Sequence, residues 1–289
     1  MVIVIKKSYR KIFHHKKVIN YYKRSKFGYN IVLWGSKHFG FYPSSNNDIH
    51  ERRAQELMQD LIARKLHINK NQLILDAGCG RGIVSTYLSK KYGCKIVGIE
   101  IVPFEVESAK KLAKNLDLES KVEYHLMDYS NTTFRDNHFD AIYTMESFVH
   151  SLEAKKTLHE FLRILKPGGR LAMFEYTIAD DKKFTHWEKN IMDIVIEGSG
   201  MASLKNLRHD SFPKTLKEVG FVSVEEQNIT KHVGPSLERL HKLSIIPYFF
   251  VNLFGLHKNF INLTAGYELY KITKKGLIRY CIFAAKKPK

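Results

Sequence analysis

The sequence has few cysteines and no long apolar run, and acidic residues are almost missing from its two ends. Only 3 of 289 residues are cysteine, which argues against a disulfide framework and favours a reducing, cytoplasmic compartment. The longest apolar stretch, residues 243–256, is too short to span a bilayer and contains Pro247 and Asn252. The first apolar residues precede the first positive charges, which is the reverse of a secretory signal peptide.

The positive charge is unevenly distributed. Residues 1–47 contain 10 Lys or Arg and no acidic residue, residues 227–289 contain 11 against 2, and the whole chain has a net charge of +18. The excess therefore lies at the two ends, which favours an anionic partner such as a membrane surface, a diphosphate or nucleic acid. Simple solubility is the alternative explanation.

From residue 73 onward, apolar runs alternate with amphipathic stretches, and this alternation predicts a doubly wound, mostly parallel α/β sheet. Residues 1–45 are basic and aromatic, with an irregular middle. We expect a turn at the KPGGR segment, 166–170, because proline and two glycines end a helix. We expect strands at 73–76, 95–99, 122–126, 139–144, 170–175, 221–227 and 276–287, and helices at 48–66 (capped by Asp48), 82–91, 103–115, 154–165, 183–198 and 211–220.

This pattern predicts one large α/β domain with additions at both ends. Residues 1–66 would form a basic, aromatic cap with a lead-in helix, and residues 67–180 the ligand-binding core. Residues 181–289 would supply an insertion over the substrate and the closing strands of the same sheet.

The segment ILDAGCGRG is the most informative local motif. An apolar strand leads into Asp76, and Gly78, Gly80 and Gly82 then form a turn in which a ligand can approach the backbone closely. Glu100 ends the next strand, at a distance along the chain that suits the two hydroxyls of a ribose. Because the turn reads DxGxG and not GxGxxG, it favours the adenosyl group of S-adenosylmethionine over a dinucleotide. The alternatives are that the glycine turn is purely structural and that Glu100 is a solvated residue at a strand end.

An acidic and an aromatic residue, Asp128 and Tyr129, follow the third strand. Such an acid can accept a hydrogen bond from the adenine amino group, although an Asx turn is the plain alternative. The full set of residues that we expect at the cofactor is Asp76, Gly78, Cys79, Gly80, Glu100, Ile101, Asp128, Tyr129, Met145, Tyr22 and Trp34.

Two longer segments, FDAIYTMESFVHSL and LRILKPGGRLAMFEYTIAD, resemble the class I S-adenosylmethionine-dependent methyltransferases. Within that class the chain is similar to the sterol C-24 methyltransferases and related isoprenoid C-methyltransferases. The motifs that carry this resemblance are Trp34-Gly35 with His38-Phe39, Asp76 to Gly82, Glu146 with His150, Lys166 to Arg170, and Glu175-Tyr176 with Asp180. The resemblance implies a seven-stranded Rossmann-like sheet with a reversed last strand, S-adenosylmethionine as cofactor, and C-methylation of an isoprenoid or sterol-like alkene.

This reaction builds a carbocation and then needs a base, so we expect Glu146, His150 and His38 to be catalytic. For Glu146 and His150 the alternative is a glutamate beside a helix dipole and an ordinary polar histidine. Aromatic faces stabilise cations, although they also serve in ordinary packing; our candidates for an aromatic lid are Tyr21, Tyr22, Trp34, His38, Phe39, Phe41 and Tyr42. Glu175 and Glu197 are further candidates for facing the pocket. We expect the His14-His15 pair to be solvated and no metal to be needed.

Other functions compete with this hypothesis. A small-molecule O- or N-methyltransferase and a cyclopropane-type lipid methyltransferase would share the cofactor turn. A nucleic-acid amine methyltransferase is disfavoured, because TMES at 144–147 replaces the usual [DN]PP[YF] motif. A non-catalytic regulator that binds the cofactor is a further alternative. We expect a small, apolar or anionic lipid-like substrate and peripheral contact with a membrane surface; the oligomeric state stays open.

Overall fold

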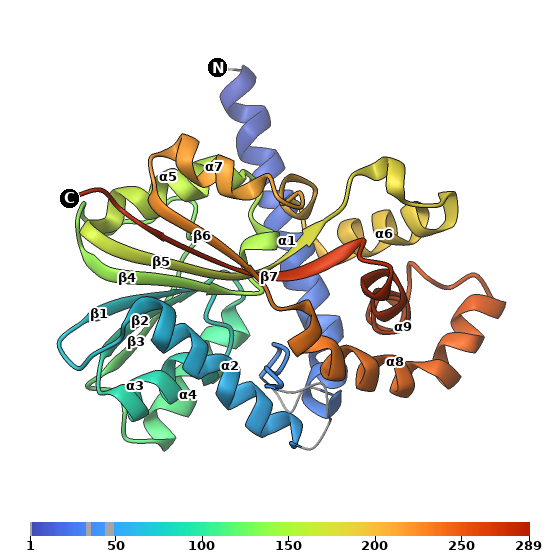
Figure 1. The fold of residues 1–289 in the computed structure, drawn as a ribbon, viewed down its shortest axis with the longest axis horizontal. Helices are drawn as coiled ribbons and strands as arrows, with labels where there is room; N and C mark the ends of the chain where they lie inside the picture. Colours follow the sequence, from blue (N-terminus) through green and yellow to red (C-terminus); the bar gives the residue numbers. More distant parts are fainter. Residues whose placement is uncertain (1, 33–35, 44–48) are drawn as a thin grey trace.

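The computed structural model describes residues 2–32, 36–43 and 49–289. Its centre is a seven-stranded sheet with the strand order β3-β2-β1-β4-β5-β7-β6 (Figure 1). The strands are β1 (Leu73–Ala77), β2 (Lys95–Glu100), β3 (Val122–Leu126), β4 (Phe139–Met145), β5 (Leu165–Ile178), β6 (Val222–Asn228) and β7 (Ile278–Lys286).

The first five strands of the sheet are parallel, and β7 runs antiparallel to both β5 and β6. The predicted doubly wound sheet with a reversed last strand is therefore confirmed. The chain winds outward in one direction through β2 and β3 and in the other through β4 and β5. The strand order thus reverses between β1 and β4, where open α/β sheets bind their ligands at the carboxyl ends of the strands.

Two hydrophobic cores lie on opposite faces of the sheet, because successive side chains of a strand point to opposite sides. Leu75 belongs to the core that also contains α5 (Ala154–Ile164) and α7 (Phe212–Val219). Ile74 belongs to the other core, which is covered by α2 (Glu51–Leu66), α3 (Ile83–Tyr92) and α4 (Pro103–Asn115). Both faces of the central strands are therefore buried, as a parallel sheet requires.

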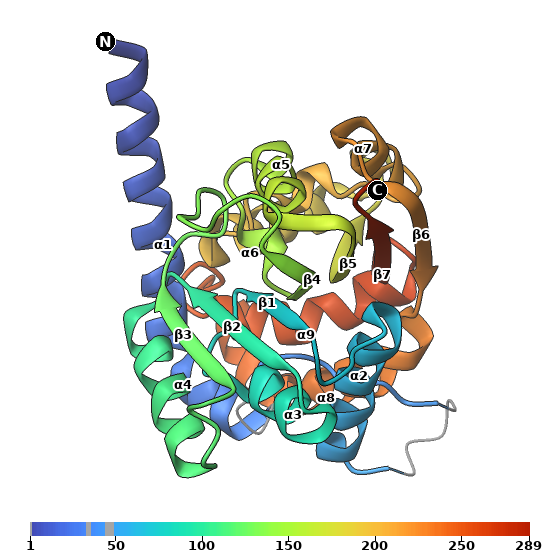
Figure 2. The same cartoon turned by 90° about the vertical axis from the view of Figure 1, so that its left-hand side faces the viewer.

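The remaining helices gather around the carboxyl edge of the strands. α1 (Val2–Val32) packs along the domain, and its N-terminal end projects from the body (Figure 2). α6 (His186–Ser199), α8 (Thr230–Leu253) and α9 (Ile261–Lys274) form a separate group beside the sheet (Figure 1). Short 3₁₀ turns occur at η1 (Phe148–His150), η2 (Asp181–Lys183) and η3 (Leu204–Asn206).

Three local predictions need correction. Residues 26–32 continue α1 where we expected irregular chain. The lead-in helix begins at Glu51 and is capped by His50, whose side chain accepts the N–H of Arg52; Asp48 lies outside the described residues. The KPGGR segment is part of β5, where the pairing with β4 shifts register and Gly168 takes a φ of 74°. The glycine thus permits a bulge in the strand where we expected a separate turn.

Candidate active site

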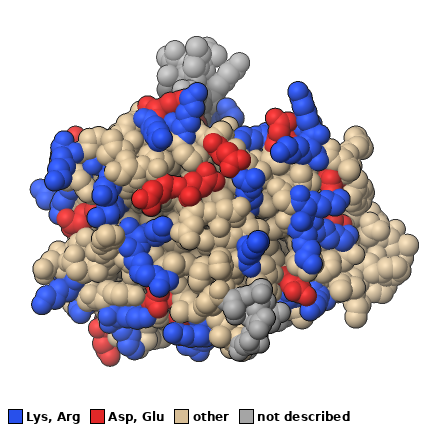
Figure 3. Space-filling view, in the orientation of Figure 1, with Lys and Arg blue, Asp and Glu red and all other residues tan. Residues whose placement is uncertain are grey.

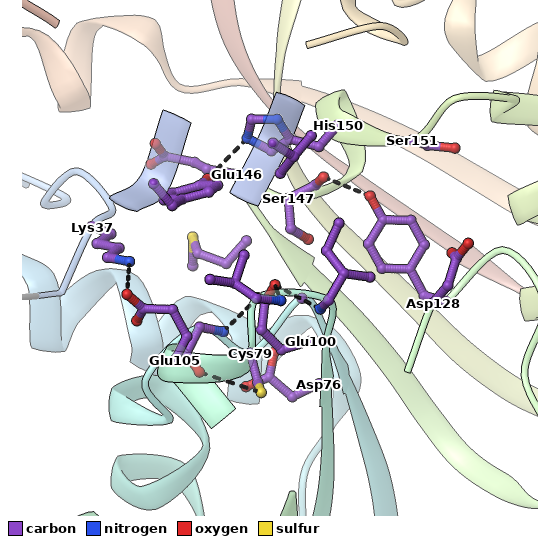
Figure 4. Close-up of a pocket in the computed structure, with 18 of the residues that line it drawn as sticks. Lys37, Asp76, Cys79, Glu100, Glu105, Asp128, Glu146, Ser147, His150 and Ser151 are labelled. Carbon is purple, nitrogen blue, oxygen red and sulfur yellow. Dashed lines mark hydrogen bonds and ion pairs between the residues drawn. The ribbon is translucent and has the colours of Figure 1, made fainter. Parts of the chain in front are cut away.

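A cavity of about 470 Å³ lies at the carboxyl ends of the central strands. Glu146, Ser147 and His150 line one side of it, and Asp76, Cys79 and Glu100 line the opposite side (Figure 4). Of the eleven residues predicted at the cofactor, Trp34 lies outside the described residues. The others all line this cavity: Asp76, Gly78, Cys79, Gly80, Glu100, Ile101, Asp128, Tyr129, Met145 and Tyr22.

The glycine turn after β1 leaves its backbone open to this cavity. Gly78 and Gly80 have φ values of 91° and 51°, which residues with a side chain rarely adopt. A Cβ added to Gly78 would lie 2.4 Å from the Cβ of Ser147, whereas Gly80 has no heavy atom within 4 Å of that position. The backbone at Gly80 can therefore come close to a ligand, as the adenosyl group requires.

Asp76 and Glu100 supply buried carboxylates beside this turn. Burial raises the pKa of Asp76 to about 7, and its Oδ2 has no hydrogen-bond partner among the described residues. Glu100 accepts the backbone N–H groups of Gly80 (3.1 Å), Ile101 (2.8 Å) and Val102 (3.0 Å). An orphaned carboxylate oxygen beside an open glycine backbone fits a ligand with hydroxyl or ammonium donors, and S-adenosylmethionine carries both.

Asp128 is tied to α1. Its Oδ2 lies 2.7 Å from the Nζ of Lys11 and 3.2 Å from Nε2 of His15. Burial alone would raise its pKa, but these two partners hold the pKa of Asp128 well below its usual range. The carboxylate is thus ionised, and α1 forms one wall of the cavity.

The expectation of a solvated His14-His15 pair is wrong. His14 is buried, and its Nε2 lies 2.7 Å from the carbonyl oxygen of His150, while His15 pairs with Asp128. Both histidines therefore attach α1 to the loops that follow the strands. Within the described residues, no group of three or more His, Cys, Asp or Glu side chains is arranged to hold a metal ion.

A second cavity of about 350 Å³ adjoins the first. Its walls come mainly from α1, α6, α8 and α9, with further residues from η3 and β7, and they are mainly apolar. The apolar residues include Met192, Val195, Met201, Leu204, Leu240, Leu263, Leu269 and Ile278. Four residues line both cavities: Tyr22, Lys37, Glu146 and His150. These four side chains therefore mark the junction between a polar cavity and an apolar one.

Glu146 is held rigidly at this junction. Its Oε1 accepts the backbone N–H of Phe39 (2.9 Å) and the hydroxyl of Tyr280 (3.0 Å), and its Oε2 accepts the hydroxyl of Tyr176 (2.6 Å). Burial raises the pKa of Glu146 to about 7. Its φ of 53° is unusual for a residue with a side chain, and such strain is common at functional sites.

His150 is neutral and points toward Tyr22. Burial lowers the pKa of His150 to about 4. Its Nδ1 lies 3.3 Å from the carbonyl oxygen of Gly200, which can only accept a hydrogen bond, so we assign the proton to Nδ1. Nε2 then accepts the hydroxyl of Tyr22 at 2.9 Å.

His38 also lines the first cavity, but both of its ring nitrogens contact protein groups. Nδ1 lies 3.0 Å from the carbonyl oxygen of Phe39, and Nε2 lies 3.1 Å from Nε2 of Gln59. This geometry favours a positioning role, because His38 fixes the segment whose Phe39 N–H contacts Glu146.

Some candidates from the sequence do not reach either cavity. Glu175 is buried beneath the loop after β4, where its Oε1 accepts from Thr144 and from the N–H groups of Ser147 and Phe148. Glu197 is exposed on α6. In the aromatic segment, Tyr21, Tyr22 and Phe39 line a cavity, whereas Phe41 stacks on His232 and Tyr42 bonds Glu51.

Sequence reasoning missed the roles of Lys37 and Tyr280. The Nζ of Lys37 lies 2.7 Å from Glu105 and 4.7 Å from the centre of the Tyr22 ring, which places a cation at the junction. Tyr280 comes from the last strand, β7, and no local motif marks it. For Lys37 the only signal was its position within the WGSKHF segment.

Known methyltransferases resemble this chain in sequence and in fold. Residues 75–173 match the family described as "Methyltransferase domain". The chain is 32% identical over 252 residues to an S-adenosyl-L-methionine-dependent Diels-Alderase of Talaromyces variabilis, covering 84% of this chain and 85% of that one.

A sterol 24-C-methyltransferase of Kluyveromyces lactis is 30% identical over 210 residues, which is 70% of this chain but only 55% of the relative. The chain thus matches about half the length of that enzyme. Among solved structures, the cyclopropane synthase MmaA2 of Mycobacterium tuberculosis superposes with a TM-score of 0.77 at 16% identity, covering 95% of this chain and 98% of that one. A likeness at this identity shows the shared fold.

Proposed function

The chain belongs to the class I S-adenosylmethionine-dependent methyltransferases, and we propose that its acceptor is a carbon atom of an isoprenoid or sterol-like alkene. Membership of this family makes the protein a methyltransferase that uses S-adenosylmethionine. The two cavities described above support the acceptor and the type of atom that we propose.

The junction between the two cavities is the observation that carries this proposal. A polar cavity beside the glycine turn meets an apolar one at Glu146, His150 and Tyr22. The apolar cavity has the size of a small-molecule pocket, and its walls suit a hydrocarbon. A methyl group held in the first cavity would face an alkene held in the second, with water excluded from both.

Two of the four side chains at the junction, Glu146 and Tyr22, suit alkene chemistry. Bound S-adenosylmethionine would supply an electrophilic methyl group. When an alkene carbon takes that methyl, positive charge develops on the neighbouring carbon of the acceptor. The carboxylate of Glu146 and the aromatic face of Tyr22 would stabilise this charge.

A base must then remove a proton from the acceptor so that the C–H electron pair forms a new double bond. Glu146 suits this task better than His150, because its pKa of about 7 makes it the stronger base of the two. His150 would instead hold the hydroxyl of Tyr22, which keeps that ring in place.

The experiment is methyl transfer from S-adenosylmethionine that carries a deuterated methyl group. Sterols with a side-chain alkene and prenyl diphosphates are incubated with the enzyme, and the products are analysed by mass spectrometry and NMR. We expect the label on carbon. A label on oxygen or nitrogen, with none on carbon, would overturn the proposal and favour a small-molecule O- or N-methyltransferase.

A second candidate function is cyclisation, because the relative with 32% identity is named a Diels-Alderase. The product would then have the same mass as the substrate and would carry no label. Such a reaction would not consume the cofactor, because no methyl group leaves it. A product of unchanged mass that forms without release of S-adenosylhomocysteine therefore distinguishes cyclisation from methyl transfer.

A further inference from the structure

The outer surface of α8 is apolar. Most of the exposed large apolar side chains of the described residues lie between positions 243 and 260: Leu243, Ile245, Ile246, Phe249, Phe250, Leu253, Phe254, Leu256 and Phe260. Ile246 and Phe254 are 74% and 65% exposed. Such a large exposed apolar patch is rare on a protein that faces only water. We call this surface the α8 patch.

The α8 patch is not the core-facing side of the helix. A different face of α8, with Ser244, Tyr248 and Val251, is already buried. The hydroxyl of Tyr248 bonds Glu268 on α9 at 2.8 Å, and its ring stacks on Tyr267 at 4.1 Å. The helix therefore has a packed inner face and an apolar outer face, where a water-exposed helix would be polar.

Basic residues flank the α8 patch, although one of them, Lys242, pairs with Glu238 at 2.9 Å. No acidic residue occurs between positions 243 and 267, and Lys242 and Lys258 flank the apolar run and are exposed. Figure 3 shows an uncharged lobe at the right-hand edge of the molecule, where the end of α8 lies in Figure 1, with both basic and acidic side chains at its inner border. Trp187 on α6 is 47% exposed, and its ring lies 5.6 Å from that of His257.

The α8 patch also borders the apolar cavity. Phe260 is 47% exposed and at the same time lines that cavity, together with Ser244 of α8 and Leu263 of α9. Arg24, which is exposed on α1, lines the same cavity. Phe260, which reaches the surface, and Glu146 therefore line one and the same cavity.

We propose that the α8 patch docks on an anionic phospholipid bilayer and that the acceptor enters the apolar cavity from the bilayer past Phe260. The entry route rests on the proposed function, whereas docking itself does not. No helix among the described residues is long and apolar enough to cross a membrane, so the patch lies within the interface, as amphipathic anchors do. The net charge of +18 opposes pairing with a second copy and favours anionic headgroups.

The test is co-sedimentation with vesicles of phosphatidylcholine, with and without phosphatidylserine, at low and high salt. Three proteins are compared: the wild type, an Ile246→Asp/Phe249→Asp variant, and a Phe13→Asp control. Phe13 is 72% exposed on α1, outside the α8 patch. We expect salt-sensitive binding of the wild type and the control to anionic vesicles, and at least about tenfold weaker binding of the double variant.

Three outcomes would overturn the proposal. The wild type could fail to bind anionic vesicles at low salt, or the double variant could bind as well as the wild type. Light scattering could also show that the wild type is a dimer and the double variant a monomer, which would assign the α8 patch to contact with a second copy. Thermal unfolding of the double variant, which changes only exposed side chains, shows whether it is folded.

Tryptophan fluorescence tests separately which part of the protein contacts the bilayer. Brominated phospholipids quench tryptophan only where the side chain reaches the acyl region, and the chain contains two tryptophans. We expect quenching that is lost in Trp187→Phe, because the Trp187 ring contacts His257 within the segment that carries the patch. Quenching that persists in this variant would overturn the placement of this part of the patch at the bilayer. Neither binding experiment requires turnover, so a failed methylation assay would count against the acceptor and not against docking.

Discussion

The hydroxyl of Tyr280 donates a hydrogen bond of 3.0 Å to Oε1 of Glu146. This contact joins the reversed strand β7 to the end of β4, between residues that are 134 positions apart in the chain. Tyr176, the neighbour of Tyr280 across β5 and β7, donates to the other oxygen of the same carboxylate. The closing strand thus helps to set the protonation of the group that we place at the reacting carbon.

Replacing Glu146 by Gln keeps the shape of the side chain and removes its charge. If Glu146 faces the forming cation, kcat should fall at least about 100-fold. Affinity for S-adenosylmethionine should barely change, because the glycine turn and Glu100 are untouched. Single-turnover rates and titration calorimetry measure the two effects. Equal losses in both would instead make Glu146 a cofactor or structural residue.

The hydroxyls that bond Glu146 should control the pH dependence of turnover. Burial raises the pKa of Glu146 to about 7, and the hydrogen bonds from Tyr176 and Tyr280 oppose that rise. We therefore expect kcat to increase with pH through about 7 as the carboxylate ionises. Tyr176→Phe should move the midpoint of this limb to higher pH, and Tyr280→Phe should move it less, since its hydrogen bond is longer. Unchanged midpoints in both variants would show that the rise of kcat with pH does not come from ionisation of Glu146.

The strands around the glycine turn could be predicted because their signals are local. The apolar runs that form β1 and β2 each lead into an acidic residue, Asp76 and Glu100. Pro103 then marks the first residue of α4. Parallel strands bring their carboxyl ends to one edge of the sheet. The sequence therefore indicated that Asp76, Glu100 and Asp128 would meet, and all three line one cavity.

The wall formed by α1 could not be predicted in this way. Its buried residues His14, Val18, Tyr21 and Ser25 recur at helical spacing, but two of them are polar and do not indicate a core face. The contact of Tyr280 with Glu146 is also invisible locally, because it depends on the insertion of β7 between β5 and β6. Non-local pairing of this kind follows only from the folded sheet.

Replacing Glu100 by Ala should weaken S-adenosylmethionine binding by roughly 1.5–3 kcal/mol, the contribution of hydrogen bonds to a charged group. The Glu100 carboxylate accepts the backbone N–H groups of Gly80, Ile101 and Val102. Part of the lost affinity would therefore come from a change in the conformation of these backbone segments. Glu123→Ala on the neighbouring strand β3 is the matched control, because its side chain does not line the cavity. Calorimetry that gives wild-type affinity for Glu100→Ala would exclude this residue from the cofactor site.

The stability of the protein should depend on pH through Glu175. Burial raises the pKa of Glu175 from 4.5 to about 8 in the folded protein. Between these values the folded state binds the proton and the unfolded state does not. The free energy of unfolding therefore falls as pH rises, by up to about 1.4 kcal/mol per pH unit from this group.

Replacing Glu175 by Gln gives a neutral side chain that can still accept from Thr144, Ser147 and Phe148 through one oxygen. We expect the variant to lose this pH dependence, so that its stability relative to the wild type increases from about pH 5 to about pH 8. Urea unfolding across that range measures the difference, and Glu197→Gln, an exposed change on α6, is the control. Parallel stability curves for the wild type and Glu175→Gln would show that Glu175 is ionised in the folded protein. The loop after β4, which carries Glu146, would then rest on a buried carboxylate and not on a neutral acid.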